Sequence, residues 1–425
     1  MQKPKGTYDV NGELGRKTIH ILNLARTILD KYNYEYWRTP IFEASELFHR
    51  GVGETTDIVT KETYDFLDRG DRNMTLRPEG TAGIVRAYVE NKYYGDANQP
   101  TKTWYYGPMY RYEKPQAGRF REFYQLGVEV FNSNDPSIDA EVINIPVNLY
   151  KMLGLKGIRV KINSLGDTES RLKYRGSLLE YFKPYIDDLC DDCKARYLKN
   201  PMRILDCKVD KDSEILKNAP KILDYLNDDS KKYFAEVLKR LDELEIDYEV
   251  DPNVVRGLDY YTHTVFEVET LSDKLGNQNV LCAGGRYNGL VKTIGDVDVP
   301  GVGFALGMER LISVLEIEGI DLETKPSLDV YVIPMDSSCK DYTVPLVQTL
   351  RLNGFKCDTD YLNRAFKSNF KQADRFNANF VIIVGSDEIK NQKLTVKDNN
   401  THEEYKVDLD KIIEFLDEKL GDEHE

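Results

Sequence analysis

The segment Gly107–Glu129 reads GPMYRYEKPQAGRFREFYQLGVE and is the most informative stretch of the 425-residue sequence. Aromatic residues at both ends predict two β-strands, and Pro115 and Gly118 predict the loop between them. Basic residues gather at this loop, and several cations around one point suit a polyphosphate ligand. The alternative is a solvated basic hairpin. The basic residues are Arg111, Lys114, Arg119 and Arg121.

The second predicted strand carries polar residues at alternate positions. Gln125, Gly127 and Glu129 are spaced two apart. Because successive side chains of a strand point to opposite faces, we expect Gln125 and Glu129 to face the same way.

Four further segments combine charged residues with glycine or tyrosine. Three of them have a plainer alternative: an aromatic core strand with surface charges for RGLDYYT, a simple turn for AGGRYNGL, and a surface arginine on an amphipathic helix for GVGFALGMERL. The segments are RPEGT (Arg77–Thr81), RGLDYYT (Arg256–Thr262), AGGRYNGL (Ala283–Leu290) and GVGFALGMERL (Gly301–Leu311). The sequence has no Walker phosphate loop, no HExxH metal pair and no GxSxG nucleophile elbow.

Composition excludes several classes of protein. The chain has 41% hydrophobic and 31% charged residues, as an ordinary globular protein does. Its net charge of -14 argues against coating nucleic acid by bulk charge. Six cysteines are too few for a disulfide scaffold. No apolar run is long enough to span a membrane, and the N-terminus lacks a secretory signal, so we expect a cytoplasmic protein that does not bind membranes.

The texture of the sequence changes along the chain. Residues 1–165 mix helix and strand signals, with helical spacing at 15–33. Lys, Asp, Glu and Leu dominate about 170–245, which predicts a helical insertion. Strand-like segments and glycines are frequent again at 250–310. After the polar segment DLETKPSL, alternating strand and helix patterns predict a small α/β domain with a mostly parallel sheet. We therefore expect domains at 1–325 and 326–425.

Taken together, the segments resemble class II histidyl-tRNA synthetases. Pro40 looks like the proline of motif 1, the dimer-forming element; Arg111 looks like the arginine of motif 2; Gly307 and Arg310 look like motif 3. RGLDYYT and AGGRYNGL are similar to the two histidine-specific signatures, and LRPEGT is also characteristic. The resemblance implies an α+β fold: a class II antiparallel sheet with flanking helices, a helical insertion and a C-terminal α/β anticodon-binding domain, in a homodimer.

The resemblance also implies a reaction: ATP-dependent ligation of L-histidine to tRNA(His) through a histidyl-adenylate, releasing AMP and pyrophosphate. Arg111 matches the residue that binds the α-phosphate, and Arg310 the one at the γ-phosphate, with Arg119 as its helper. Arg256 matches an arginine that this family places at the α-phosphate, so Arg256 and Arg111 are the expected catalytic residues. ATP is expected to bring Mg²⁺ as a substrate complex, with no tightly bound metal in the protein itself.

The histidine pocket is assigned in the same way. Glu79, Thr81 and Gln125 match residues that hold the α-ammonium and carboxylate groups, and Glu129 and Tyr261 match those that read the imidazole nitrogens. The full expected histidine-binding set is Glu79, Gly80, Thr81, Arg111, Gln125, Glu129, Arg256, Tyr260, Tyr261 and Tyr287. Gln116 and Arg121 are expected to contact the tRNA acceptor end.

Two questions stay open at this point. Cys190 and Cys193 form a CxxC pair and Cys207 adds a third thiol, but no second CxxC or histidine pair completes a zinc site, so we interpret them as structural or incidental cysteines with zinc as the alternative. The rival functions are a non-catalytic regulatory paralogue and an RNA-binding module. For anticodon recognition, the segment Arg351–Arg375 has six basic residues against three acidic ones; the alternative is a solvated helix face.

Overall fold

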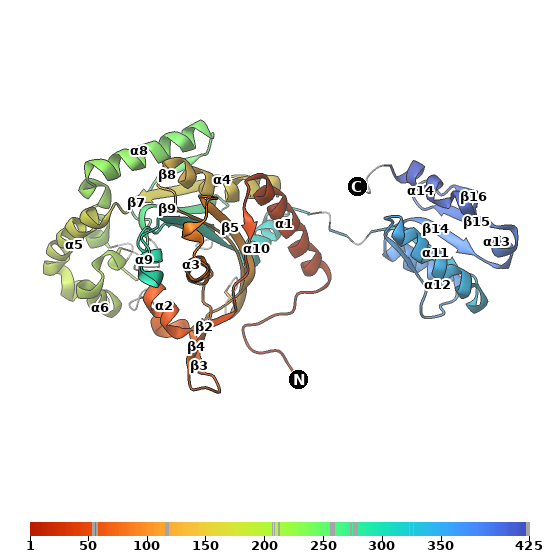
Figure 1. Cartoon of the computed structure of the whole chain (residues 1–425), viewed down its shortest axis with the longest axis horizontal. Helices are drawn as coiled ribbons and strands as arrows, with labels where there is room; N and C mark the ends of the chain where they lie inside the picture. Colours follow the sequence, from red (N-terminus) through yellow and green to blue (C-terminus); the bar gives the residue numbers. More distant parts are fainter. Residues whose placement is uncertain are drawn as a thin grey trace. The chain divides into compact units, whose positions relative to one another are not determined.

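A computed structural model of the chain divides into two compact units, Met1–Leu322 and Glu323–Glu425 (Figure 1). The residues that the structure describes are 1–52, 56, 58–114, 119–205, 207, 209–210, 213–255, 260–272, 274, 279–322, 324–325 and 327–421.

The first unit is built on an eight-stranded sheet. Six neighbouring strands, from β5 to β7 in the order below, pair antiparallel, whereas the two outermost pairs, β1–β5 and β7–β8, are parallel. The order is β1 (Glu35–Tyr36), β5 (Thr101–Tyr110), β6 (Glu122–Phe131), β11 (Gly301–Gly307), β10 (Val280–Arg286), β9 (Thr262–Thr270), β7 (Ile158–Ser164) and β8 (Tyr248–Val250). The expected antiparallel class II sheet is therefore confirmed.

Strand alternation divides this sheet into an apolar face and a face that carries polar residues. Leu126, Val128 and Val130 of β6 enter a core that also holds Val302, Phe304 and Leu306 of β11. Four helices complete this core: α1 (Gly12–Lys31), α4 (Pro136–Met152), α8 (Asp228–Glu243) and α10 (Met308–Glu318). The intervening residues, Gln125 and Glu129 among them, must then face the opposite side.

The opposite side is covered by shorter elements. Its core includes residues from α3 (Thr81–Glu90), α9 (Leu290–Gly295) and α5 (Thr168–Phe182). The helical insertion expected from the sequence is present. Its other elements are η3 (Lys183–Asp188), α6 (Asp191–Lys199), η4 (Pro201–Ile204), α7 (Glu214–Lys217) and η5 (Ile222–Tyr225), before α8. A separate small sheet has the order β2 (Phe42–Ala44), β4 (Asn73–Leu76) and β3 (Tyr64–Leu67), and α2 (Ser45–Val52) packs on it beside η1 (Ile58–Glu62). The short helix η2 (Tyr93–Gly95) follows α3.

A buried ion pair ties the sheet to α4. Arg286 of β10 and Asp139 of α4 have fully buried side chains and bind one another. Arg286 Nε donates to both carboxylate oxygens at 3.2 Å, and its Nη1 donates to the Ser133 carbonyl at 2.7 Å. Arg286, the arginine of AGGRYNGL, therefore forms a structural ion pair with Asp139.

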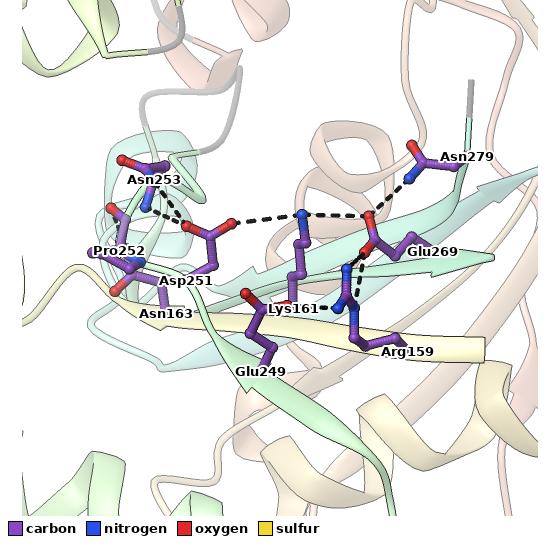
Figure 2. Close-up of polar contacts among 9 residues, drawn as sticks. All are labelled: Arg159, Lys161, Asn163, Glu249, Asp251, Pro252, Asn253, Glu269 and Asn279. Atoms are coloured by element: carbon purple, nitrogen blue, oxygen red, sulfur yellow. Dashed lines mark hydrogen bonds and ion pairs between the residues drawn. The ribbon is translucent and has the colours of Figure 1, made fainter. Parts of the chain in front are cut away.

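A second polar network lies at the end of the sheet formed by β9, β7 and β8 (Figure 2). Glu269 of β9 is 2% exposed and is paired with Arg159 at 2.6 Å and with Lys161 at 3.5 Å, both on β7. Asn163, also on β7, donates to the carbonyls of Pro252 and Val254 at 3.2 and 3.1 Å. These contacts fix the chain just before Val255, where it reaches the cavity described below.

The second unit is a five-stranded sheet with helices. Its strands are β13 (Cys357–Thr359), β12 (Leu328–Pro334), β14 (Ala378–Val384), β15 (Lys393–Asp398) and β16 (Glu404–Asp408), in that order. The first three are mutually parallel, but β15 and β16 pair antiparallel. The expectation of a mostly parallel sheet is therefore right for three strands and wrong for the final hairpin. The helices are η7 (Ser337–Cys339), α11 (Lys340–Leu352), α12 (Phe366–Arg375), α13 (Ser386–Asn391), η8 (Leu409–Lys411) and α14 (Ile412–Leu420). Within the described ranges, no helix of either unit is long and apolar enough to cross a bilayer.

Candidate active site

A cavity of about 660 Å³ lies on the polar side of the large sheet. This volume is in the range of small-molecule sites. The cavity gathers residues from strands and loops that are far apart in the sequence. Of the residues expected at the site, those that line it are Glu79, Thr81, Arg111, Arg119, Gln125, Glu129, Tyr260, Tyr261, Tyr287 and Arg310.

Glu129 is the most buried acidic group of the cavity. Its side chain is surrounded by hydroxyls: Thr81 Oγ1 donates to Oε1 at 2.7 Å, and Tyr287 Oη donates to Oε2 at 2.5 Å. Tyr105 Oη lies 3.4 Å from Oε1. Burial disfavours the charged form and outweighs these hydrogen bonds, raising the pKa of Glu129 to about 8. The cavity therefore contains a carboxyl group that exchanges a proton near neutral pH.

Glycines make room for the tyrosines beside Glu129. A Cβ at Gly127 would lie 2.4 Å from the Tyr105 ring, and one at Gly301 would lie 2.2 Å from the Tyr287 ring. A Cβ at Gly303 would lie 2.0 Å from Glu129 Oε2 and 2.3 Å from the Val128 carbonyl oxygen. These contacts are closer than real Cβ atoms show, so the close packing requires glycine at these positions.

Glu79 lies at the start of α3. Its carboxylate accepts from the backbone N–H groups of Thr81 and Ala82 at 2.8 and 2.7 Å. Gly80 between them is the N-cap of α3, and a Cβ there would lie 2.3 Å from the Tyr105 ring. Burial raises the pKa of Glu79, although these hydrogen bonds oppose the shift. Glu79 therefore holds the helix start and still presents its carboxyl group to the cavity.

Aromatic rings and one amide complete this end of the cavity. The Tyr260 ring lies 4.7 Å from that of Tyr261 and 5.7 Å from that of Tyr287. Burial raises the pKa of Tyr260 and Tyr287 well above the ordinary value, so both hydroxyls are neutral donors. Gln125 Oε1 is buried and has no hydrogen-bond partner among the described residues. Such an atom requires a donor, which a ligand can supply.

Three of the arginines that line the cavity are those expected from the sequence: Arg111, Arg119 and Arg310. Arg111 Nε donates to the Pro78 carbonyl at 2.9 Å, and its guanidinium lies 5.1 Å from the Phe123 ring centre. Arg310, in the first turn of α10, donates to the Val280 carbonyl at 3.1 Å. Burial lowers the pKa of both guanidiniums, and the positive charge of Arg119 lowers that of Arg310 further. Because burial disfavours the charged form of these guanidiniums, the site is suited to an anionic ligand that stabilises their charge.

Other expected residues lie elsewhere or outside the described part of the chain. Arg121 is absent from the cavity lining; its guanidinium lies 4.0 Å from the Tyr112 ring centre and its Nε donates to the Glu113 carbonyl at 3.2 Å. Arg256 and Gln116 lie outside the described residues, so their expected roles stay predictions.

The insertion contributes a wall that sequence reasoning missed. Arg171 of α5, Arg196 of α6, and Asn200 and Arg203 near η4 line the same cavity. Arg196 Nη1 donates to the Arg203 carbonyl at 3.3 Å. The charged, glycine-poor composition of this region predicted helices correctly, but nothing in it indicated which helix side faces the sheet. Glu267 and Glu309 also line the cavity.

Comparison with known proteins gives the same family for nearly the whole chain. The family model described as "Histidyl-tRNA synthetase" matches residues 6–172 and 186–311, and "Anticodon binding domain" matches 329–419. A histidine--tRNA ligase of Geobacillus sp. (strain WCH70) is 52% identical over 99% of both chains, and one of Staphylococcus haemolyticus is 49% identical over 98% of this chain and 99% of its own. The crystal structure of apo S. aureus histidyl-tRNA synthetase superimposes with a TM-score of 0.85 at 42% identity, covering 98% of this chain and 99% of that one. The chain belongs to the histidyl-tRNA synthetase family.

Proposed function

We propose that this protein ligates L-histidine to tRNA(His) at the expense of ATP, through a histidyl-adenylate, with release of AMP and pyrophosphate. The observation that carries the proposal is the cavity itself. It joins a buried carboxyl group among tyrosine hydroxyls to a set of half-buried arginines, which are the chemistries that an imidazole and a polyphosphate require.

Histidine binds at the Glu129 end. Glu129 and Tyr261 read the two imidazole nitrogens, because an acceptor and a hydroxyl together fix one tautomer of the ring. The unpartnered Gln125 Oε1 and the Glu79 carboxylate receive the α-ammonium group. A site that pairs both ring nitrogens rejects an apolar side chain by about 10⁴-fold or more, as comparable sites do.

ATP binds at the arginine end, where two anions must meet. The histidine carboxylate attacks the α-phosphate, so positive charge and alignment supply most of the catalysis. Arg111 stands between the amino-acid pocket and the phosphates and binds the α-phosphate. Arg310, with Arg119, binds the γ-phosphate. Arg256 is assigned to the α-phosphate on the sequence resemblance alone.

Magnesium arrives with ATP as part of the substrate. Glu113 and Glu267 both line the cavity, and their negative charges oppose the lowering of the pKa of Arg310 by burial. Mg²⁺ is ordinarily held by one or two carboxylates together with substrate phosphates. These two residues therefore fit the ion, which neutralises charge on the phosphates as they separate.

The second unit is proposed to bind the tRNA anticodon. Of the six basic residues in Arg351–Arg375, two are paired with neighbours: Arg364 with Asp360 at 2.7 Å and Arg351 with Asp358 at 3.2 Å. The other four are exposed, which leaves them suited to phosphate contacts. They are Lys356, Lys367, Lys371 and Arg375. Assembly as a homodimer through the Pro40 region is part of the same proposal.

Histidine-dependent exchange of pyrophosphate into ATP tests the proposal. The purified chain should catalyse exchange with L-histidine and not with L-phenylalanine, and should charge tRNA(His) when tRNA is added. Binding of tRNA without any exchange would support the RNA-binding alternative. A folded chain with neither exchange nor charging would support the regulatory paralogue.

A further inference from the structure

Four potential metal ligands meet in the insertion, away from the residues assigned to the reaction. Cys190 is the N-cap of α6, Cys193 lies in its first turn, and Cys207 and Asp210 follow η4. One ligand atom from each of the four lies within 4.8 Å of the other three. We propose that Cys190, Cys193, Cys207 and Asp210 bind one zinc ion that holds the insertion wall of the cavity in place.

Two of the distances between ligand atoms are close to the edges of a tetrahedral zinc site, and the remaining pairs lie within 4.8 Å. The Cys190 and Cys207 sulfurs are 3.6 Å apart, and the Cys207 sulfur lies 3.5 Å from Asp210 Oδ2. With Zn–S of about 2.3 Å and Zn–O of about 2.1 Å, the edges of a tetrahedron are about 3.8 Å between sulfurs and about 3.6 Å between sulfur and oxygen. The sulfurs are too far apart for a disulfide, which needs about 2.05 Å.

The cluster is buried and carries exchangeable protons. Cys193 and Cys207 are 0% and 3% exposed. The Cys207 thiol donates toward Asp210 Oδ2, and the same carboxylate accepts from the Cys190 backbone N–H at 3.1 Å. A divalent cation replaces the thiol protons, which leave to solvent as the thiolates bind.

Asp210 supplies the ligand that the sequence pattern lacked. Cys190-Asp-Asp-Cys193 is a CxxC pair, and Cys207-Lys-Val-Asp210 repeats its spacing with aspartate in the fourth place. Zinc accepts aspartate beside cysteine, and thiolates favour zinc over magnesium. A search for cysteine and histidine alone does not include this fourth ligand.

The proposed ion connects the two ends of the cavity wall. Between Cys193 and Cys207 the chain carries Arg196, Asn200 and Arg203, all of which line the cavity. By holding α6 against the segment after η4, the ion fixes the positions of these three residues and takes no part in the reaction itself. The ion is thus a structural staple, comparable to closed zinc sites in which the protein supplies all four ligands.

Metal analysis of the full-length chain tests this proposal without measuring activity. The chain, purified under reducing conditions after growth with zinc, should contain one zinc per polypeptide by elemental mass spectrometry. Cys193→Ser and Cys207→Ser should lose the zinc. The matched control is Cys357→Ser, which changes a buried cysteine of the second unit that lies outside the cluster, and it should retain the zinc.

Cobalt substitution keeps the test decisive where a cysteine variant fails to fold. Wild-type protein reconstituted with Co²⁺ should show the visible bands of a tetrahedral thiolate site. Asp210→Cys should retain the metal and strengthen the thiolate-to-cobalt charge-transfer absorption, because a fourth sulfur binds. Reduced, folded wild-type protein that takes up neither zinc nor cobalt would overturn the proposal. A disulfide between Cys190 and Cys207 in the native protein would also overturn it.

Discussion

Replacement of Glu129 by glutamine should make the stability of the first unit less sensitive to pH. The pKa of Glu129 is about 8 in the folded chain against an ordinary value of 4.5. Between these values the folded state holds a proton that the unfolded state releases. The stabilisation is therefore fully present below pH 4.5 and is lost as pH rises through 8. Glu129→Gln cannot titrate, so it lacks this dependence.

The size of the effect follows from the linkage relation. At about 1.4 kcal/mol per pH unit in the middle of the window, the free energy of unfolding of wild type relative to Glu129→Gln should fall by about 2 kcal/mol from pH 6 to pH 8. For a unit ending at Leu322, this corresponds to a relative shift of about 3 °C in melting temperature.

Intrinsic fluorescence isolates the relevant transition. Both tryptophans, Trp37 and Trp104, belong to the first unit, so their melting curves at fixed protein concentration report that unit. Glu236→Gln, at an exposed position of α8, is the matched control and should give a constant difference from wild type. The reasoning is refuted if the melting temperature of wild type minus that of Glu129→Gln stays constant or rises from pH 6 to pH 8.

Four further outcomes are expected. Arg310→Ala should raise the KM for ATP about 10- to 100-fold, the loss of one charge-assisted phosphate contact, with little change in the KM for histidine; an unchanged KM for ATP in exchange assays would exclude the γ-phosphate role. Gly303→Ala should weaken histidine binding by about 1–3 kcal/mol through overpacking against Glu129, and calorimetric titration showing normal affinity would contradict the contact. Arg286→Met should lower the free energy of unfolding by about 3–5 kcal/mol because it leaves Asp139 buried without its partner; denaturant unfolding measures this, and a stability equal to wild type is the contrary result. Truncation after Leu322 should preserve pyrophosphate exchange and abolish tRNA charging, whereas equal loss of both would indicate a structural role for the second unit.

Local patterns in the sequence predicted much of the sheet and part of the site. The alternation of Gln125 and Glu129 placed both side chains on one face, and both line the cavity. Helical spacing at 15–33 corresponds to α1, Gly12–Lys31. These successes share a cause: the periodicity of a strand or helix is set by neighbours in the sequence, so it can be recognised without knowing the tertiary contacts.

The features that were missed depend on contacts between distant segments. Arg171, Arg196 and Arg203 lie on helices of mixed polarity, and only the packing of the insertion against the sheet brings them to the cavity. The β15–β16 hairpin was missed because its strands are short, charged and near the edge of their sheet, so they lack the apolar runs of β12 and β14. Glu129 was expected to bind the ligand, but the burial that raises its pKa depends on distant segments, because the tyrosines packed around it come from β5 and the chain after β10.

The glycines beside Glu129 and its tyrosines limit how the amino-acid specificity of this chain can change. A pocket bounded by side chains is enlarged by shortening one of them, but Gly303, which lines the cavity, and Gly127 and Gly301, which pack against Tyr105 and Tyr287, have no side chain to shorten. Every substitution there removes space, and greater depth would require moving the central strands of the sheet. Selection for a bulkier amino acid must therefore act on Glu129 and the tyrosines around it, and under the proposed function it would remove the imidazole contacts in the first step. Directed-evolution libraries at these glycines should yield only narrower pockets or unfolded chains.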